Sequence, residues 1–219
     1  IDLSKRSLAY ALMSADRLGI TGVDFYQLDL LSVKDLKRDF DVVESVGVLH
    51  HMEDPEEGLK ALLQVVRPGG YLRLGLYSEI SRQRLVKLRK LYVKSGMTPS
   101  EDNIRAVRQA ILSSQAAQGV FGIVNQFSDF YAMSPCRDLI FHEQEHRFTL
   151  SQIKSLLEKY KLNFLGFSGL RRTVVEAFVQ RYDTESLLSL DAWAEFEQDN
   201  PNIFSGMYQF MTQVPTKVA

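Results

Sequence analysis

Two carboxylates lie where predicted strands end, and they are the first candidates for binding chemistry. Asp2 ends a strand at the start of the sequence, and Asp29 ends a strand expected over 23–28. A carboxylate at a strand tip can accept hydrogen bonds from the vicinal hydroxyls of a ribose, and Asp29 could accept one from the amine of an adenine, with Leu30 packed on the ring. Taken alone, each residue fits a helix-capping or turn aspartate equally well.

A third group follows the strand expected over 40–49, in the stretch that runs from Ser45 to Pro55. Gly47 allows a ligand to approach the backbone closely. The adjacent His50 and His51 suggest a metal site, but neighbouring residues of a strand point to opposite sides and no third ligand has a matching spacing. We therefore expect no metal, one structural histidine and one histidine that faces a pocket.

The elements that must position these residues alternate between helix and strand. The patterns predict helices over 5–17, capped by Ser4, and over 55–66, a helical turn over 33–38, and strands over 23–28, 40–49 and 71–77. This alternation predicts an α/β fold with a doubly wound, mostly parallel sheet, in which ligands bind outside the carboxyl ends of the strands.

The rest of the chain divides into three predicted parts after an α/β part over 1–78. Residues 79–148 form a helical insertion, rich in Arg and Lys, that could bind an acidic or phosphorylated molecule or simply present solvated helix faces. It contains His142 and His146 at helical spacing, again without a third ligand. Residues 149–183 form a helix to Tyr160, capped by Thr149, and an antiparallel hairpin with strands over 162–167 and 173–181, and residues 184–219 form a helical tail.

Composition excludes several classes of protein. The 219 residues contain 26 basic and 27 acidic side chains, so the net charge of -1 gives no general attraction to nucleic acid or to an anionic membrane. A single cysteine rules out an intramolecular disulfide and fits a cytoplasmic protein. No apolar run approaches the ~20 residues of a membrane span.

These motifs, in this order, resemble the class I S-adenosylmethionine-dependent methyltransferases, of the type 11/12-like kind. Residues 1–4 (IDLS) are similar to the end of the family's second strand, and residues 27–30 (QLDL) to the end of its third. Residues 40–55 are similar to its fourth strand and the following loop, and residues 65–72 (VVRPGGYL) to the turn that enters its fifth.

The resemblance implies S-adenosylmethionine as the cofactor and methyl transfer to an unidentified small-molecule or protein acceptor, with residues 1–78 as the cofactor-binding part and residues 79–148 as the cap over the acceptor. It implies that Asp2 and Leu3 contact the ribose, Asp29 and Leu30 the adenine, and Ser45, Val46 and Gly47 the sulfonium and methionine part. A base is needed only if the acceptor must lose a proton, and the candidates are His51, His50 and Tyr77.

One departure from the family pattern concerns its first strand. In the family, the first strand lies between the second and fourth strands of the sheet, and a glycine-rich loop follows it. No such glycine-rich motif occurs in residues 1–219. We expect either a fragment of a longer bacterial enzyme or a homodimer that compensates for the missing strand. Two other classes remain open: a non-catalytic module used in protein interaction or assembly, and a nucleotide-dependent oxidoreductase with Asp2 on a ribose.

Overall fold

The computed structural model describes residues 1–113, 124, 127–141, 145–204 and 206–216. The chain forms two compact units. Unit 1 contains residues 1–75, 155–168 and 209–219, and unit 2 contains residues 76–154 and 169–208. The described part of the chain contains no helix long and apolar enough to cross a membrane.

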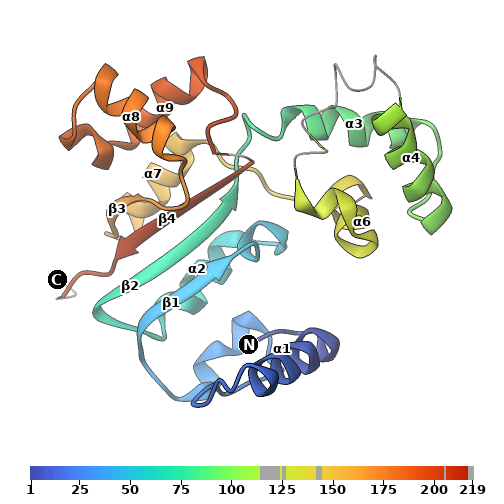
Figure 1. Cartoon of the computed structure of the whole chain (residues 1–219). Coiled ribbons are helices and arrows are strands. Elements are labelled where there is room, and N and C mark those ends of the chain that lie inside the picture. The colour runs from blue at the N-terminus through green and yellow to red at the C-terminus, as the bar shows by residue number, and fades with distance from the viewer. Residues whose placement is uncertain (114–123, 125–126, 142–144, 205, 217–219) are drawn as a thin grey trace. The chain divides into compact units, whose positions relative to one another are not determined.

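The described strands form a sheet of four in the order β1-β2-β4-β3 (Figure 1). β1 (Phe40–Val46) is parallel to β2 (Val66–Tyr77), and β3 (Asn163–Phe167) is antiparallel to β4 (Met207–Gln213). A separate parallel bridge joins Asp2 to Gln27. The predicted α/β class, with a parallel part and an antiparallel C-terminal pair, is confirmed.

The N-terminal helices of unit 1 begin at side-chain caps. Ser4 accepts a hydrogen bond from Ser7 N–H and starts α1 (Lys5–Arg17), and Asp54 accepts one from Glu56 N–H and starts α2 (Pro55–Leu63). Such caps satisfy N–H groups that the helix itself cannot pair. Two 3₁₀ helices are η1 (Leu30–Leu36), which Asp29 caps, and η2 (Leu49–His51), which follows β1. The strand predicted over 23–28 is wrong, since that segment forms only the isolated bridge at Gln27.

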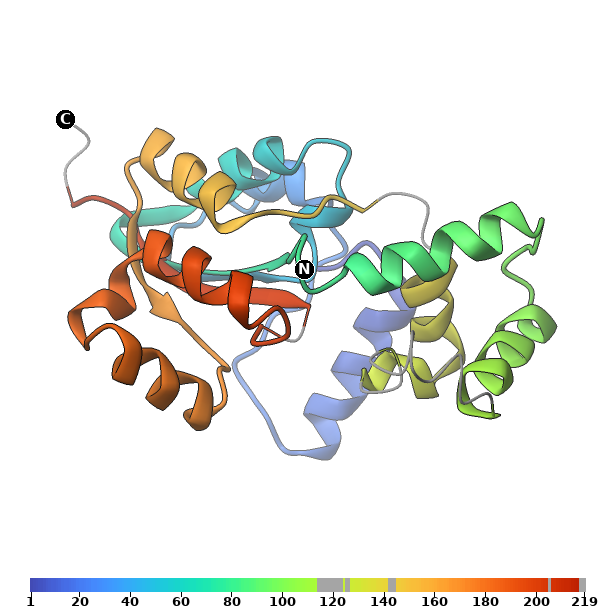
Figure 2. The same ribbon diagram turned by 90° about the horizontal axis from the view of Figure 1, so that it is seen from above.

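α2 covers one face of the sheet, on the same side as the end of α7 (Leu150–Lys159; Figure 2). Glu56 of α2 binds Lys159 and accepts a hydrogen bond of 2.6 Å from the Tyr160 hydroxyl. Leu59 and Leu62 of α2 and Leu72 and Leu74 of β2 are buried, with 2 % or less of their surface exposed. This apolar layer fixes β1 and β2, and therefore the ends of those strands.

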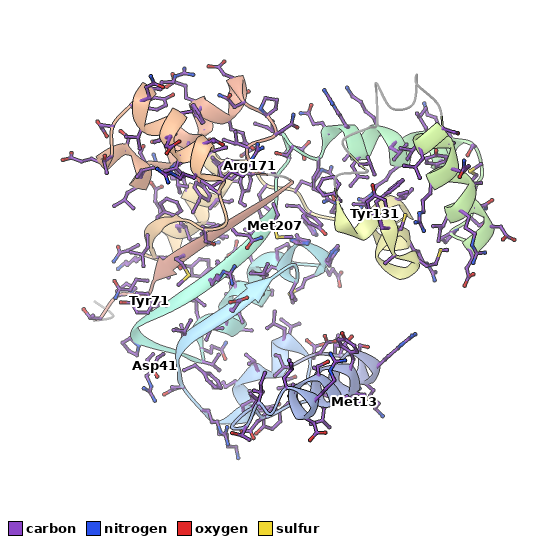
Figure 3. The ribbon with its side chains drawn as sticks, viewed as in Figure 1. Met13, Asp41, Tyr71, Tyr131, Arg171 and Met207 are labelled. Atoms are coloured by element: carbon purple, nitrogen blue, oxygen red, sulfur yellow. The ribbon has the colours of Figure 1, made fainter. Side chains whose placement is uncertain are left out.

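α1 is packed differently from α2, because none of its residues is buried. Tyr10 and Met13 are each 72 % exposed, and Met13 points outward from the helix (Figure 3). A helix of this length is marginal without tertiary packing. The predicted bounds and cap of this helix are confirmed, but its apolar residues are not part of a core.

Unit 2 is built from helices around two apolar clusters. The first contains α3 (Gln83–Lys94), α4 (Glu101–Ser113), η4 (Ser128–Tyr131) and α6 (Met133–Phe141). The second contains α8 (Arg172–Arg181), η5 (Glu185–Leu188) and α9 (Leu190–Asp199), in which the ring of Phe178 stacks on Trp193 with centroids 3.8 Å apart.

The structure corrects the prediction for the C-terminal segments. Residues 173–181, predicted as the second hairpin strand, belong to α8, because Val174 and Phe178 lie four residues apart and are both buried on one helix face. The tail over 184–219 is not wholly helical, since it contains β4, in which Tyr208, Phe210 and Thr212 alternate as buried residues. β4 therefore takes the place beside β3 that residues 173–181 were expected to occupy.

Candidate functional site

The carboxylates predicted at strand ends line one cavity of unit 1, with a volume of about 640 Å³. This volume is in the range of small-molecule sites in proteins. One part of the lining is apolar and includes Leu28, Val42 and Val43, and the rest is polar and includes Asp2 and Asp29. The cavity lies beside β1, which has one neighbour, β2, among the described strands.

Asp2 and Asp29 are held by local hydrogen bonds at the cavity wall. Oδ1 of Asp2 accepts a hydrogen bond of 2.7 Å from Ser4 N–H, and Oδ1 of Asp29 accepts one of 2.9 Å from Leu31 N–H. Both side chains are therefore capping aspartates as well as cavity residues. Each carboxylate keeps further acceptor capacity for a ligand, because an ionised carboxylate has about four lone-pair sites. Leu3 and Leu30 also line the cavity.

Ser45 provides the least satisfied polar group of the lining. Its side chain is 3 % exposed, and its hydroxyl has no hydrogen-bond partner among the described residues. An unpaired buried hydroxyl costs about 1–3 kcal/mol. Val46 ends β1 and Gly47 follows it, and neither is among the described residues that line the cavity.

Gly47 turns the chain at this strand end with a φ of 82°, in the left-handed region. A Cβ atom at this position would meet no other atom within 4 Å. Glycine is therefore required here by backbone conformation, and the space beside it is open.

The two histidines differ in their surroundings. His50 has none of its surface exposed, whereas His51 is half-buried and lines the cavity. Their rings meet edge to face, with centroids 4.4 Å apart. Of the two histidines, His51 is therefore the one that faces the cavity.

Tyr77, the third predicted base, lies at the end of β2 and belongs to unit 2. The guanidinium of Arg82 lies over its ring, 3.6 Å from the centroid. Glu145 binds Arg82 through two hydrogen bonds of 3.0 and 2.9 Å and also pairs with Arg89 at 2.7 Å. Burial alone would raise the pKa of Glu145, but the two guanidinium groups outweigh it and hold that pKa below its usual value.

A second buried network in unit 2 joins three side chains. The Glu197 carboxylate is 1 % exposed and accepts hydrogen bonds from Ser78 (2.9 Å) and from the Tyr208 hydroxyl (2.7 Å). Burial raises the pKa of Glu197 to about 7, against the lowering effect of these hydrogen bonds. Burial and the neighbouring carboxyl also raise the pKa of Tyr208.

Metal binding finds no support in the described part of the chain, which contains no group of three or more His, Cys, Asp or Glu side chains able to hold an ion. His142, one of the two spaced histidines of the cap, lies outside the described residues.

Sequence reasoning missed two further carboxylates of the lining, Glu44 and Glu53. Glu44 forms an ion pair of 2.9 Å with Arg73, which also donates a hydrogen bond of 3.0 Å to Gln209. No sequence signal distinguishes Glu53 from an exposed loop residue, since only the folding of η2 brings it to the cavity.

Comparison with known proteins found one family model that matches the N-terminal part of this chain. Residues 1–74 match the family model described as "Methyltransferase domain". An uncharacterized protein of Synechococcus sp. is 30 % identical over 210 residues, which is 90 % of this chain and 49 % of the relative. The chain therefore spans about half the length of this curated relative.

Two solved structures of PKMT2 from Rickettsia typhi share the fold. The structure in complex with AdoHcy aligns with a TM-score of 0.62 at 13 % identity, and it covers 100 % of this chain and 44 % of PKMT2. The second aligns with a TM-score of 0.68 at 14 % identity, with the same coverage. At this level of identity the likeness concerns the fold.

Proposed function

We propose that this chain, which carries a class I S-adenosylmethionine-dependent methyltransferase domain in residues 1–74, binds S-adenosylmethionine in the cavity beside β1 and serves methyl transfer to an acceptor. The observation that carries the proposal is the meeting of Asp2, Asp29 and Ser45 at one cavity. These residues come from three separate segments of the chain, joined by the parallel bridge between Asp2 and Gln27 and by β1.

The lining fits the chemistry of that cofactor. Asp2 and Leu3 would hold the ribose, and Asp29 and Leu30 the adenine, since carboxylates accept from hydroxyl and amine donors and leucine packs on a ring. The Ser45 hydroxyl, with the strand end at Val46 and Gly47, would contact the methionine part. The cofactor supplies an activated methyl group, and the protein supplies proximity and alignment.

A base would act only for an acceptor that must lose a proton. His51 is the better candidate of the two histidines, because it lines the cavity while His50 is buried. Tyr77 is the third candidate, at the carboxyl end of β2. The acceptor would be a small molecule or a protein.

We infer that a further β-strand completes unit 1 beside β1. β1 pairs with one strand among those described, and the apolar part of the cavity separates it from the bridge between Asp2 and Gln27. The exposure of α1 supports the same inference. The strand would come from a longer polypeptide of which this chain is a fragment, or from a second copy in a homodimer. The bacterial relatives and the single cysteine support a cytoplasmic enzyme of a bacterium.

Calorimetric titration tests the proposal. S-adenosylmethionine is titrated into this chain and into a form extended upstream of Ile1, and light scattering gives the mass of each. Binding by either form supports the cofactor site, and binding by the extended form alone supports the fragment. Binding by neither form contradicts the proposal and favours a non-catalytic module that acts in protein interaction or assembly.

A further inference from the structure

The carboxyl of Glu197 is buried against hydroxyl groups instead of a cation. Glu197 lies on α9 and is 1 % exposed, and Ser78, directly after β2, and Tyr208, on β4, have none of their surface exposed. Within the described part of the chain, no lysine or arginine forms an ion pair with Glu197. A buried carboxylate without a cation is costly, so such a group favours its protonated form.

The charged side chains on the elements around this network are paired with one another and not with Glu197. They are Glu79 with Arg147, Arg82 with Glu145, Asp191 with Lys154, and Glu195 and Asp199 with Arg181. Glu79 also acts on Tyr208, where it adds to the rise in the pKa of the hydroxyl. Of these groups, the Glu197 carboxyl is therefore the one whose proton is governed by burial.

The distances within the network call for three protons. Ser78 Oγ lies 2.9 Å from Glu197 Oε1 and 3.0 Å from the Tyr208 hydroxyl oxygen, which lies 2.7 Å from Glu197 Oε2. Ser81 N–H donates a further hydrogen bond of 3.0 Å to Ser78 Oγ. A hydroxyl donates one proton and accepts two, so the two hydroxyls supply protons for two of the three contacts. The third proton has to come from the carboxyl.

The two charge states of Glu197 differ in how well they fill these contacts. When Glu197 is ionised, both hydroxyls donate to it, and the contact between Ser78 and Tyr208 brings two oxygen lone pairs together. When Glu197 is protonated, it donates to Ser78, Ser78 donates to Tyr208, and Tyr208 donates back to Glu197. Such closed chains of hydrogen bonds strengthen one another. Burial raises the pKa of Glu197 to about 7, in agreement with this arrangement.

We propose that this network is a proton-operated latch, in which protonated Glu197 holds α9 to the end of β2 and to β4, and loss of the proton releases α9. The latch does not depend on the proposed function. It lies at a junction of the chain, because Ser78 N–H donates to the Gly206 carbonyl (3.0 Å) and the Ser81 hydroxyl to the Pro201 carbonyl (2.7 Å). The segment between α9 and β4 therefore meets the end of β2 at the same place.

The direction of the pH effect follows from the two pKa values of Glu197. In the open form the carboxyl meets water and has its ordinary pKa of 4.5, whereas in the closed form the pKa is about 7. Between these values the open form releases the proton and the closed form keeps it, so opening becomes easier as pH rises. From pH 5 to pH 7 the opening equilibrium of α9 should rise about thirtyfold, and above pH 7 it should level off.

Hydrogen exchange of the backbone amides, corrected for the intrinsic rate at each pH, measures this opening. In the parent chain, the amides of α9 should lose about thirtyfold in protection between pH 5 and pH 7. At pH 7 their exchange should not depend on dilute urea, the mark of a local opening that exposes little surface, while the slowest amides of α2 should exchange faster in urea. Glu197→Gln cannot ionise, and its amide can donate to Ser78 and accept from Tyr208, so protection of its α9 should not change with pH. Glu158→Gln, which removes an exposed acid of α7, should behave as the parent does.

Infrared spectroscopy detects the proton itself. At pH 6 the parent chain should show the C=O stretching band of a protonated carboxyl, which fades with a midpoint near pH 7 and is absent from Glu197→Gln. Ser78→Ala removes the acceptor of this proton and should shift the frequency of the band. The band and its midpoint are measured on the parent chain, so they test the latch even where a variant does not fold.

Three results would overturn the latch. If the parent shows no band of a protonated carboxyl at pH 6, Glu197 is ionised and the network lacks its third proton. If protection of α9 in the parent does not change between pH 5 and pH 7, the proton does not hold the helix. If the amides of α9 depend on urea as the slowest amides of α2 do, the carboxyl acts only on global unfolding and no local release occurs.

Discussion

Replacement of Glu197 by glutamine should abolish a pH-dependent loss of stability. The pKa of the buried carboxyl is raised from 4.5 to about 7. Between these values an unfolded chain releases the proton while the folded chain keeps it, so the free energy of unfolding falls as pH rises. At ~1.4 kcal/mol per pH unit, the interval between the two pKa values corresponds to a loss of about 3 kcal/mol in the free energy of unfolding. Below pH 4.5 both states are protonated, and above pH 7 the loss is complete.

Glutamine keeps an acceptor oxygen for Ser78 and Tyr208 but cannot ionise. Glu197→Gln should therefore match the parent chain near pH 4.5 and exceed its stability by up to about 3 kcal/mol at pH 8. Urea unfolding at pH 4.5, 6 and 8 measures this difference, with Glu158→Gln as the control for loss of an exposed acid. If the difference in the free energy of unfolding between Glu197→Gln and the parent chain stays constant with pH, the reasoning is refuted, because burial would then not raise the pKa of Glu197.

Three further changes test the site and its frame. Asp2→Asn should weaken S-adenosylmethionine about ten- to hundredfold in calorimetry, the effect of lost charge-assisted hydrogen bonds, whereas Asp16→Asn on exposed α1 should not. Gly47→Ala should lower the free energy of unfolding by about 1–2 kcal/mol through its φ of 82° alone, and an unchanged melting temperature would contradict this. Glu145→Gln should cost about 3–5 kcal/mol in urea unfolding, because Arg82 stays buried without its carboxylate; a loss below 1 kcal/mol would show that the cluster tolerates the missing charge.

Local signals in the sequence predicted local structure well. Ser4 marked the start of α1, and the pair Thr149 and Gln152 marked the start of α7, where Thr149 Oγ1 accepts a hydrogen bond from Gln152 N–H and Gln152 Oε1 accepts one from Thr149 N–H. These interactions span three residues, so neighbouring residue types determine them without knowledge of the fold.

Signals that depend on distant partners were less reliable. The run Thr173-Val174-Val175 favours a strand by propensity, but burial of Phe178 against Trp193 makes the segment helical. Packing between segments overrides the weak preference of three β-branched residues. In β4 the alternation of buried residues was present in the sequence, and the adjoining helical pattern concealed it.

At the candidate site, too, the order of segments along the chain could be used for prediction, whereas contacts between distant residues could not be predicted. The predicted strand order placed Asp2 and Asp29 near each other, and they do line one cavity, although the structure joins their segments by an isolated parallel bridge between Asp2 and Gln27 rather than by full strands. The charge of that cavity could not be predicted in this way. It depends on where η2 places Glu53, on Arg73 neutralising Glu44, and on the absence of lysine and arginine from the described lining. Each of these is a property of three-dimensional neighbours, which the order of residues along the chain does not determine.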